Sequence, residues 1–390
     1  MNKTKARGTG IVQSIRNVTR FREILSVFVK NGFEEFIYKS KLHEIIPNFV
    51  FPASKKEQVI ANSTSNDQWW GTVGHRLRLS FEELGPAFIK FGQLLGTRDD
   101  FFAAAFTQEM KKLQDNVKGI SWAEAKESIE KCWGKPYTEV CESIIQEPIA
   151  SASIASVFTA VLKNGEKVVI KVKRQGIDQI IESDFQLMSV LVRTLENTSE
   201  QFKWMALSRT LEEFYRSIKI EVNLLYELKN LERLRVNLFK VKGSEILVLP
   251  KPYPELCNET ILVMEYLDGI PFSKLKPADV TKELQEQLLK CVQLFLHSML
   301  KDGFFHADLH GGNFFSLKQN KIGVVDFGLV GTLSQKNKNT FMSILYNLMI
   351  GDFDRLVYEL LEVAEYDEVP DYQELSRDLE ITLSPFLIDS

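Results

Sequence analysis

The chain is poor in cysteine and has no long apolar run. Its 390 residues include four cysteines, none of them in a C-x-x-C pair. This usage indicates neither a disulfide framework nor a zinc cluster, and it suits a reducing compartment such as the cytoplasm. No run approaches the roughly 18 to 20 apolar residues of a membrane-spanning helix, and the polar start MNKTKARGTG lacks the apolar core of a secretory signal. We therefore expect that the chain does not span a membrane by itself.

Extreme composition is also absent. The sequence has 44% apolar and 26% charged residues, which excludes disorder and fibrous repeats, and its length exceeds what one hydrophobic core usually organises. The net charge is −4, but residues 1–42 hold nine Lys or Arg against three Glu, a net +6 that leaves −10 for the remainder. We expect two or three packed units and no binding of nucleic acid by the chain as a whole.

Apolar residues recur at near-helical spacing in residues 11–37, with basic residues at several polar positions. The pattern predicts a basic amphipathic helix that breaks at Asn31-Gly32. Two interpretations are open. The helix packs on the next domain and exposes its charged face, or residues 1–42 dock on an anionic membrane surface.

Helical and strand patterns occupy separate blocks of the chain. Residues 47–68, with two prolines and a polar stretch, are typical of a linker. Runs of β-branched residues predict two strands around Asn164-Gly165, which is the strongest short hairpin signal. Shorter apolar runs follow at 245–250 and 260–267. Helical patterns cover the end of the chain and three long segments: 74–133, 177–239 and 281–301.

Two of the five histidines lie in the segment H-A-D-L-H-G-G-N, which runs from His306 to Asn313. Asp326-Phe327-Gly328 begins thirteen residues after it. Zinc is not favoured here, because the segment has no cysteine and Asp308, Asn313 and Asp326 offer hard oxygen atoms. Oxygen ligands indicate magnesium with a polyphosphate instead.

Phosphoryl transfer needs a group that positions the nucleophile, oxygen ligands for Mg²⁺, a cation on the phosphates and a backbone cradle. Asp308 and Asn313 stand five apart, as in the catalytic loop of protein kinases, and Asp326 opens a D-F-G. Upstream, V-V-I-K places Lys171 on the second strand of the predicted hairpin, where it can reach phosphate oxygens and pair with a helix Glu. The combination makes a chance match improbable and indicates ATP and Mg²⁺ as ligands.

The candidate cradle has no glycine. Residues 148–157 read P-I-A-S-A-S-I-A-S-V, where a typical kinase has G-x-G-x-x-G. A Cβ atom at each position disfavours the left-handed backbone that glycine permits, so nucleotide affinity and orientation should differ from those of a protein kinase. We assign nucleotide binding to Lys171 and to two short segments: Ala150, Ser151, Ala152, Ser153 and Ile154, then Glu265, Tyr266 and Leu267.

The motifs together carry a family resemblance. The chain combines K-F-G-Q at 90–93, an alanine- and serine-rich loop, V-V-I-K, a helix with E-V-N-x3-E-L-K-N, H-A-D-L-H-G-G-N and D-F-G. In this it resembles the UbiB/AarF family of atypical kinases, known in eukaryotes as the coenzyme Q-linked kinase-like proteins. The similarity runs from about residue 12 to about residue 385, and F-I-K-F-G-Q-L-L-G-T-R is a signature of this family.

The resemblance implies catalytic roles for five residues. Asp308 corresponds to the catalytic-loop Asp, and Lys171 corresponds to the phosphate-contacting lysine, with Glu227 as its helix partner. Asn313 and Asp326 correspond to the Mg²⁺ ligands. These ligand residues are intact, so the resemblance implies an ATP-dependent reaction that needs Mg²⁺.

The resemblance also implies a regulatory element. Lys90, Gly92 and Gln93 match the K-x-G-Q motif, which in this family lies over the active site and restricts access. Glu221 matches the Glu of the family's E-x-D motif. Asn223 stands where Asp is usual, so one charge that would bind the lysine or a metal is missing.

The phosphate acceptor is not expected to be a peptide. After D-F-G the sequence has no long activation segment and no A-P-E, so a peptide platform is missing. The resemblance points in the same direction, to ATP hydrolysis or phosphorylation tied to isoprenoid quinone synthesis or lipid handling. Expected partners are an isoprenoid lipid or quinone precursor and quinone biosynthetic proteins, with the protein cytoplasmic or peripheral on the inner face of the membrane.

We therefore predict an α+β, protein-kinase-like fold of two lobes with a helical N-terminal extension. Residues 1–68 would form basic helices and a linker, residues 69–146 the K-x-G-Q extension, 147–266 the N-terminal lobe and 267–390 the helical C-terminal lobe. The predicted function is a Mg²⁺-ATP-dependent atypical kinase or ATPase that supports ubiquinone or related membrane-lipid metabolism.

Two other functions stay open on the sequence. A small-molecule phosphotransferase of the aminoglycoside or choline kinase type has a similar acid loop, H-G-D-L-H-x-x-N, although the K-x-G-Q motif and the D-F-G glycine argue against it. A pseudokinase scaffold that binds nucleotide and organises a biosynthetic complex is favoured by Asn223 and by the glycine-free loop.

Overall fold

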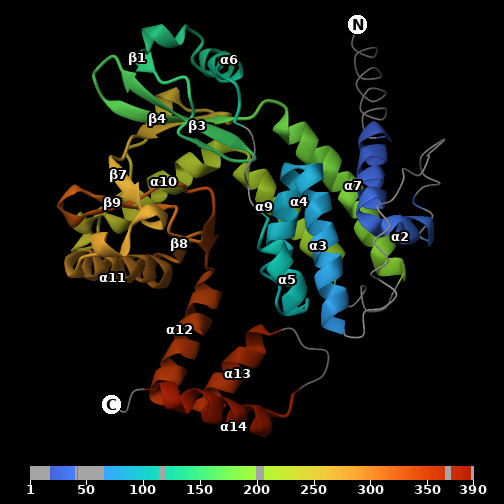
Figure 1. Cartoon of the computed structure of the whole chain (residues 1–390). Helices are drawn as coiled ribbons and strands as arrows, with labels where there is room; N and C mark the ends of the chain where they lie inside the picture. The colour runs from blue at the N-terminus through green and yellow to red at the C-terminus, as the bar shows by residue number, and fades with distance from the viewer. Residues whose placement is uncertain are drawn as a thin grey trace, which may run out of the picture. The chain divides into compact units, whose positions relative to one another are not determined.

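The computed structural model divides into two compact units (Figure 1). Unit 1 comprises Met1–Tyr226 and Tyr253–Tyr266, and unit 2 comprises Glu227–Pro252 and Leu267–Ser390. The structure describes residues 18–39, 42, 66–113, 119–198, 206–364 and 370–387. Two units lie within the expected two or three, and the predicted domain boundaries stay predictions.

The N-terminal helix packs within unit 1. Residues 18–28 are helical, and the chain continues through a π-helical turn, η1 (Val29–Phe33), into α2 (Glu34–Lys39). Gly32 has a φ of 90°, so the predicted break at Asn31-Gly32 is confirmed. The apolar residues of this segment are buried: Phe21, Ile24, Leu25, Val27, Val29 and Ile37. This burial supports the packing interpretation for the described part of residues 1–42.

An ion pair fixes this helix against the rest of unit 1. The Arg20 guanidinium donates two hydrogen bonds to the Asp184 carboxylate, at 2.7 and 3.0 Å, and a third to the Leu84 carbonyl at 2.6 Å. The side chain of Asp184 is only 1% exposed. Such a buried carboxylate needs its cation, so one arginine of the basic segment has a structural partner inside the protein.

Helices form most of unit 1, as the 3.6-residue periodicity predicts. Their bounds are α3 (Asn66–Leu84), α4 (Pro86–Leu95), α5 (Ala104–Met110), α6 (Trp122–Trp133), α7 (Ile177–Thr198) and α9 (Leu207–Glu221). Helix α3 begins inside the segment predicted as a linker, whose residues 47–65 lie outside the described residues. Helix α5 ends at Met110, with Lys111 as its C-cap residue.

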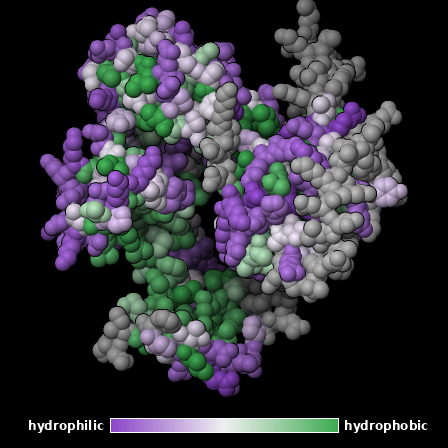
Figure 2. Space-filling model, in the orientation of Figure 1, coloured by the Kyte–Doolittle hydropathy of each residue, from purple (hydrophilic) through white to green (hydrophobic). Residues whose placement is uncertain are grey.

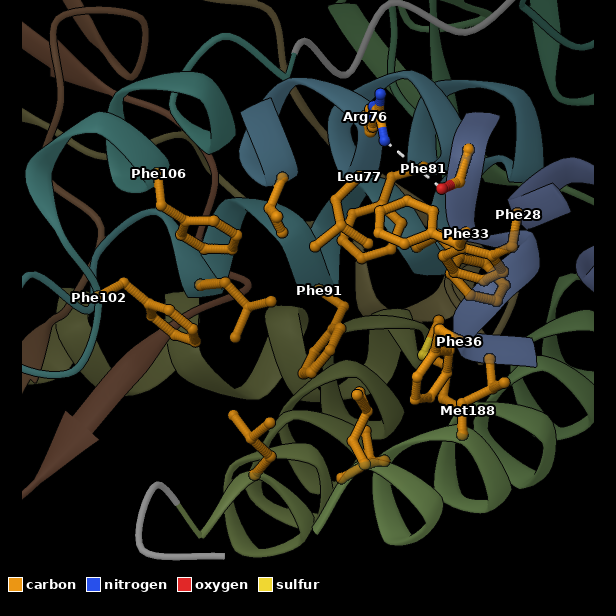
Figure 3. A pocket seen from close by; sticks show the side chains of 18 of the residues that line it. Phe28, Phe33, Phe36, Arg76, Leu77, Phe81, Phe91, Phe102, Phe106 and Met188 are labelled. Carbon is orange, nitrogen blue, oxygen red and sulfur yellow. Dashed lines mark hydrogen bonds between the residues drawn. The ribbon is translucent and has the colours of Figure 1, made fainter. Parts of the chain in front are cut away.

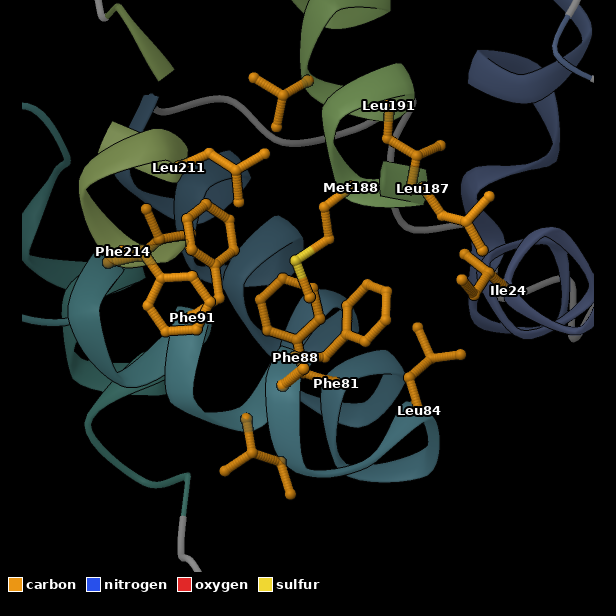
Figure 4. Close-up of a cluster of buried hydrophobic side chains, with 14 of the residues drawn as sticks. Ile24, Phe81, Leu84, Phe88, Phe91, Leu187, Met188, Leu191, Leu211 and Phe214 are labelled. Atoms are coloured by element: carbon orange, nitrogen blue, oxygen red, sulfur yellow. The ribbon is translucent and has the colours of Figure 1, made fainter. Parts of the chain in front are cut away.

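The helical layers share one aromatic-rich core. Side chains of α3, α4, α7 and α9 point toward one another in Figure 4, among them Phe81, Phe88, Met188 and Phe214. Phe91 and Phe214 lie with ring centroids 5.4 Å apart. This core orders the helical extension of unit 1 by apolar packing.

A five-stranded antiparallel sheet completes unit 1. Its strands are β1 (Cys141–Ile144), β2 (Ala150–Ser151), β3 (Ala155–Leu162), β4 (Lys167–Lys173) and β6 (Ile261–Glu265). The order is β1-β3-β4-β6, and β2 pairs with β3. The β3–β4 hairpin is confirmed, with Gly165 at a φ of 84° in its turn. One face of the sheet packs Phe158 and Ile170 against Ile129 of α6.

Unit 2 is built from helices around short strands. It begins within α10 (Leu224–Leu238) and contains a four-stranded sheet, ordered β5-β10-β9-β7, and a two-stranded sheet of β8 and β11. The strands are β5 (Leu247–Val248), β7 (Gly269–Pro271), β8 (Phe304–His306), β9 (Phe314–Leu317), β10 (Ile322–Val324) and β11 (Val330–Thr332). The short apolar run at 245–250 thus pairs with β10 in unit 2, in parallel register.

The remaining helices of unit 2 are the predicted ones. They are α11 (Lys282–His297), its π-helical continuation η9 (Ser298–Asp302), α12 (Gln335–Ile350), α13 (Phe353–Val363) and α14 (Tyr372–Leu383). Figure 2 shows hydrophobic residues gathered on the surface over α12 and α13, where Met349, Ile350 and Val363 are more than half exposed. Among the helices that the structure describes, we find none with the length and apolar character to cross a membrane.

Candidate active site

Helix α4 carries the K-x-G-Q segment and is tied to the end of α9. The Lys90 ammonium donates to the Glu221 carboxylate at 2.6 Å. Glu221 is the last residue of α9, and Asn223 caps the next helix by accepting a hydrogen bond from the Leu225 amide at 3.1 Å. Unit 1 therefore brings Lys90 and Glu221 together, while the Asn223 side chain stabilises the start of α10.

Gly92 permits close packing around α4. A Cβ atom at Gly92 would lie 2.3 Å from Cδ1 of Leu113 and 2.6 Å from Cδ2 of Phe81. Gln93 donates from Nε2 to the Leu113 carbonyl at 3.2 Å. The glycine and the glutamine of the motif thus hold the segment that follows α5 against α4.

The glycine-free loop is a tight turn between β2 and β3. Ala150 pairs with Val157, and the Ala152 amide donates to the Ala155 carbonyl at 2.9 Å. Ala150 and Ala152 are exposed, whereas Ser153 and Ile154 are buried. Of the five loop residues predicted to bind nucleotide, these two point into the interior, and Ile154 belongs to the core of the helical layers.

Lys171 lies in the middle of the sheet. Val157 pairs with Ala150 on one side and with Lys171 on the other, and Lys171 pairs in turn with Leu262. Directly opposed residues of antiparallel strands project to the same face, so Lys171 shares a face with the edge of the loop. The opposite face holds Ile170 and the other buried residues that pack on α6. Lys171 therefore lies directly beside Val157, the last residue of the loop that was predicted to hold the phosphates.

The segment after β6 links the two units along the chain. Glu265 pairs with Val168 in the sheet, and the Tyr266 amide donates to the Lys167 carbonyl at 3.0 Å. Leu267 is the first residue of this segment in unit 2 and is buried. The three residues assigned to the nucleotide are therefore held by the edge of the sheet and by the start of unit 2.

In unit 2 His306 connects the acid loop to D-F-G. Its Nδ1 atom accepts from the Asp308 amide at 3.1 Å, and its Nε2 atom lies 2.6 Å from the Asp326 carbonyl oxygen. These contacts require the neutral tautomer with hydrogen on Nε2, which donates to the carbonyl. Burial lowers the pKa of the His306 imidazole below its ordinary value, although the hydrogen bond to Asp326 acts in the opposite direction.

Asn313 is held in the same network. Its Nδ2 atom donates to the Asp308 carbonyl at 3.1 Å, and its own carbonyl accepts from the Val325 amide at 3.0 Å. The antiparallel pairing of β9 with β10 brings Asn313 beside the residue before Asp326. Because its amide nitrogen is used as a donor, the side-chain oxygen is the atom that can face a cation.

Asp326 adopts a left-handed backbone. Its φ is 64°, uncommon for a residue with a Cβ atom, and its Oδ1 atom accepts from the Gly328 amide at 3.0 Å. The next residue is fixed on both sides by α10, because the Phe327 amide donates to Glu227 at 3.4 Å and its carbonyl accepts from Asn230 at 2.9 Å. Phe327 is fully buried. Unit 2 thus determines the position of the Asp326 carboxylate through contacts on either side.

The donor set fits a hard cation. Asn313 offers an amide oxygen and Asp326 a carboxylate, and both are held by main-chain hydrogen bonds. Mg²⁺ prefers such oxygen ligands and keeps several waters or substrate oxygens in its shell. Asp308 lies at the exposed end of the same loop, with His310 Nε2 3.8 Å from its carboxylate.

The structure places the predicted residues in two groups. Asp308, Asn313, Asp326 and Glu227 share the network of unit 2, and Lys171 lies in the sheet of unit 1, so the expected pairing of Lys171 with Glu227 stays a prediction. Sequence reasoning missed Asn230 as a contact of D-F-G. Its signal was present, because Asn230 follows Glu227 by three residues on one helix and such positions share a face.

Comparison with known proteins identifies the family. Residues 112–360 match the model of the ABC1 atypical kinase-like domain. The chain is 36% identical over 324 residues to a probable protein kinase UbiB of Sodalis glossinidius, an alignment that covers 81% of this chain and 57% of the relative. The chain therefore spans less than two thirds of the length of that relative.

A cyanobacterial relative is matched over more of its length. The protein slr0889 of Synechocystis sp. is 34% identical over 315 residues, which cover 78% of this chain and 76% of that protein. Among solved structures, the complex of Rv3197 with erythromycin from Mycobacterium tuberculosis matches with a TM-score of 0.53 and 19% identity, over 82% of this chain and 78% of that one. At this identity the match shows the fold alone, and the predicted kinase-like α+β fold is confirmed. The chain belongs to the family of ABC1 atypical kinase-like domains, with UbiB proteins among its relatives.

Proposed function

We propose that the chain is a Mg²⁺-dependent atypical kinase or ATPase of the UbiB type. The observation that carries the proposal is the network around His306 in unit 2, which connects the acid loop to Asp326, a residue with a left-handed backbone at a φ of 64°. A strained backbone held by so many contacts is typical of a functional site. The matched kinase-like family and the kinase-like motifs of the sequence support the same function.

In this proposal each group has one task. Asn313 and Asp326 hold Mg²⁺, which when bound neutralises phosphate charge. Lys171 contacts the phosphates of ATP, and Ala150 and Ala152 border them from the exposed side of the turn. Asp308 accepts a hydrogen bond from the attacking hydroxyl or water and orients it.

Binding and turnover test different parts of the proposal. Asp326→Asn removes a hard charged ligand while keeping the size of the side chain, so we expect stabilisation by Mg²⁺ and ATP in a thermal melt to be lost. Asp302→Asn, a change of the same kind at an exposed position of unit 2, should bind like the unmodified protein. Equal stabilisation of both variants by Mg²⁺ and ATP would contradict the metal assignment.

The turnover test separates an enzyme from a scaffold. Asp308→Asn should keep Mg²⁺-ATP binding and lower phosphate release by about 10²-fold or more, because one positioned catalytic group typically contributes that much. A protein that binds Mg²⁺-ATP and releases no phosphate in any variant would be the pseudokinase scaffold. Phosphate transfer to an aminoglycoside or choline would identify the small-molecule phosphotransferase.

We further propose a role in ubiquinone or related membrane-lipid metabolism, in the cytoplasm or at the inner face of a membrane. The UbiB names of the relatives and the family motifs support this role. Possible partners are an isoprenoid lipid or quinone precursor, quinone biosynthetic proteins and an anionic membrane surface that meets residues 1–42. Quinone content in cells that carry only Asp326→Asn, compared with cells that carry only Asp302→Asn, tests the role without assuming the acceptor.

A further inference from the structure

A large apolar cavity lies within the helical layers of unit 1. Its volume is about 420 Å³, and it is lined by residues of η1, α2, α3, α4, α7 and neighbouring segments. Figure 3 shows that Phe33, Phe36, Leu77, Phe91 and Phe106 approach it from different helices. All of these elements belong to unit 1, so the cavity is complete without the residues of the proposed kinase site in unit 2.

The lining is almost entirely hydrocarbon. Apart from glycine and main chain, its polar residues are Arg76 and Glu35, of which Glu35 is exposed. The Arg76 guanidinium lies 3.5 Å from the Gly32 carbonyl and can donate to it, so it joins η1 to α3 (Figure 3). Apart from the indole N–H donors of Trp69 and Trp70, the other lining side chains are aliphatic, phenyl or thioether groups, which is the character of a site for an apolar molecule.

The size of the cavity separates it from an ordinary packing defect. Voids in protein cores seldom exceed a water molecule, whereas ligand pockets have volumes of about 300 to 1,000 Å³. Several lining side chains are only half-buried, among them Phe28, Trp69, Val73 and Leu77, so the cavity has an open side. The cavity therefore has the size of a small-molecule ligand pocket, and its open side lets a narrow flexible chain enter while a polar end stays outside.

We propose that this cavity binds the hydrocarbon chain of an amphiphile. The ligand class is a linear acyl chain or a branched polyprenyl chain, whose common chemistry is a long apolar tail with a polar end left outside. The proposal does not depend on nucleotide binding, because it uses the helical layers of unit 1 alone.

The first experiment measures binding as a function of chain length. Displacement of the fluorescent polyene cis-parinaric acid from the full chain is followed with octanoic, dodecanoic and hexadecanoic acids, then with geraniol, farnesol and geranylgeraniol. Burial of each methylene should tighten binding about threefold to fourfold until the cavity is full, after which affinity should stay constant. The affinities of the two series are compared at the same carbon number by interpolation between their members, and the series with the higher affinity identifies the source as acyl or prenyl. Absence of displacement, or affinity that keeps rising with length as in simple partitioning, would overturn the proposal.

A matched pair of variants locates the site. Leu77→Trp fills the cavity from α3, and Leu79→Trp makes the same change on the same helix at a more exposed position outside the lining. We expect Leu77→Trp to weaken binding of the best chain by about tenfold or more and Leu79→Trp to leave it unchanged. Where circular dichroism shows that a tryptophan variant does not fold, Leu77→Phe and Leu79→Phe give a smaller change of the same kind. Equal binding by the two members of a folded pair would place the chain elsewhere and reject the cavity.

Discussion

The helical layers of unit 1 and the acid loop of unit 2 are ordered by different interactions. The layers are held by buried aromatic and aliphatic side chains, such as Phe88 and Met188, and enclose an apolar cavity. The acid loop is held by hydrogen bonds that converge on His306 and Asp326. Apolar packing has no direction and tolerates adjustment, whereas a hydrogen-bond network depends on each member.

The comparison predicts where single substitutions act. In the layers, a loss of packing should reduce stability, and the proposed chemistry of unit 2 should be spared. In the acid loop, a change of one polar group should affect metal binding or the dependence on pH more than the fold. The variants below test this contrast between packing in the layers and polar contacts in the acid loop. The first variant is expected to be an exception, because a polar group inside the layers controls stability.

The largest effect on stability should come from removing the partner of a charge that is buried in the apolar layers. Arg20→Ala leaves the buried Asp184 carboxylate without its cation, and the expected loss of unfolding free energy is about 3 to 5 kcal/mol. Urea denaturation measures this loss. Arg193→Ala, at an exposed position of α7, the helix that carries Asp184, should change stability by less than about 0.5 kcal/mol.

A double variant distinguishes an unpaired charge from lost packing. Replacing the pair by apolar residues, Arg20→Met with Asp184→Leu, should recover most of the stability, because no buried charge then remains. If the double variant is as unstable as Arg20→Ala alone, the loss of stability comes from the missing methylene groups of Arg20 and from its lost hydrogen bond to the Leu84 carbonyl. The N-terminal helix would then depend on packing, as the neighbouring apolar helices do.

A smaller effect is expected where α4 packs most closely. In Gly92→Ala the new Cβ atom must displace Leu113 and Phe81, which should cost about 1 to 3 kcal/mol in denaturation experiments. Gly71→Ala on α3 is the matched control, since its Cβ atom would meet only Ala105, at 3.6 Å. That control should be neutral or more stable by up to about 1 kcal/mol, because alanine is the better helix former. Equal destabilisation by both changes would show that the contacts of Gly92 are not the cause.

The same division explains what the sequence could predict of the fold. Helices α7, α9 and α10 and the hairpin at Gly165 follow from local periodicity and turn chemistry. Strands β1, β8 and β9 were not predicted. Each has three or four residues, too few to show alternation, and each is defined by its pairing: β1 with β3, β8 with β11, and β9 with both β7 and β10.

For the candidate site, spacing located the residues but not their contacts. The five-residue interval between Asp308 and Asn313 and the D-F-G at Asp326 are visible in the sequence. The bridging position of His306 is not, because it requires the left-handed backbone of Asp326 and a particular imidazole tautomer. The burial of Ile154 was likewise hidden, since a turn of small residues suggests exposure and only the packing of unit 1 shows otherwise.

The smallest effect should appear as a dependence of stability on pH. The folded protein keeps His306 neutral, because burial lowers the pKa of its imidazole, while in the unfolded chain the pKa is about 6.5. The unfolded state therefore binds the proton first as the pH falls. The stability that neutral His306 gives is fully present above pH 6.5 and is lost as the pH drops toward the folded-state pKa, with a slope of at most about 1.4 kcal/mol per pH unit.

The contribution of His306 is isolated by comparison with another histidine of unit 2. Urea denaturation between about pH 5 and pH 8 should show that His306→Gln has a weaker dependence on pH than the unmodified protein, because no imidazole titrates at that position. His297→Gln, at the end of α11, serves as the matched control for the substitution. If both variants keep the slope of the unmodified protein, protonation of other groups is responsible, and the His306 network contributes to the position of Asp326 without making the fold sensitive to acid.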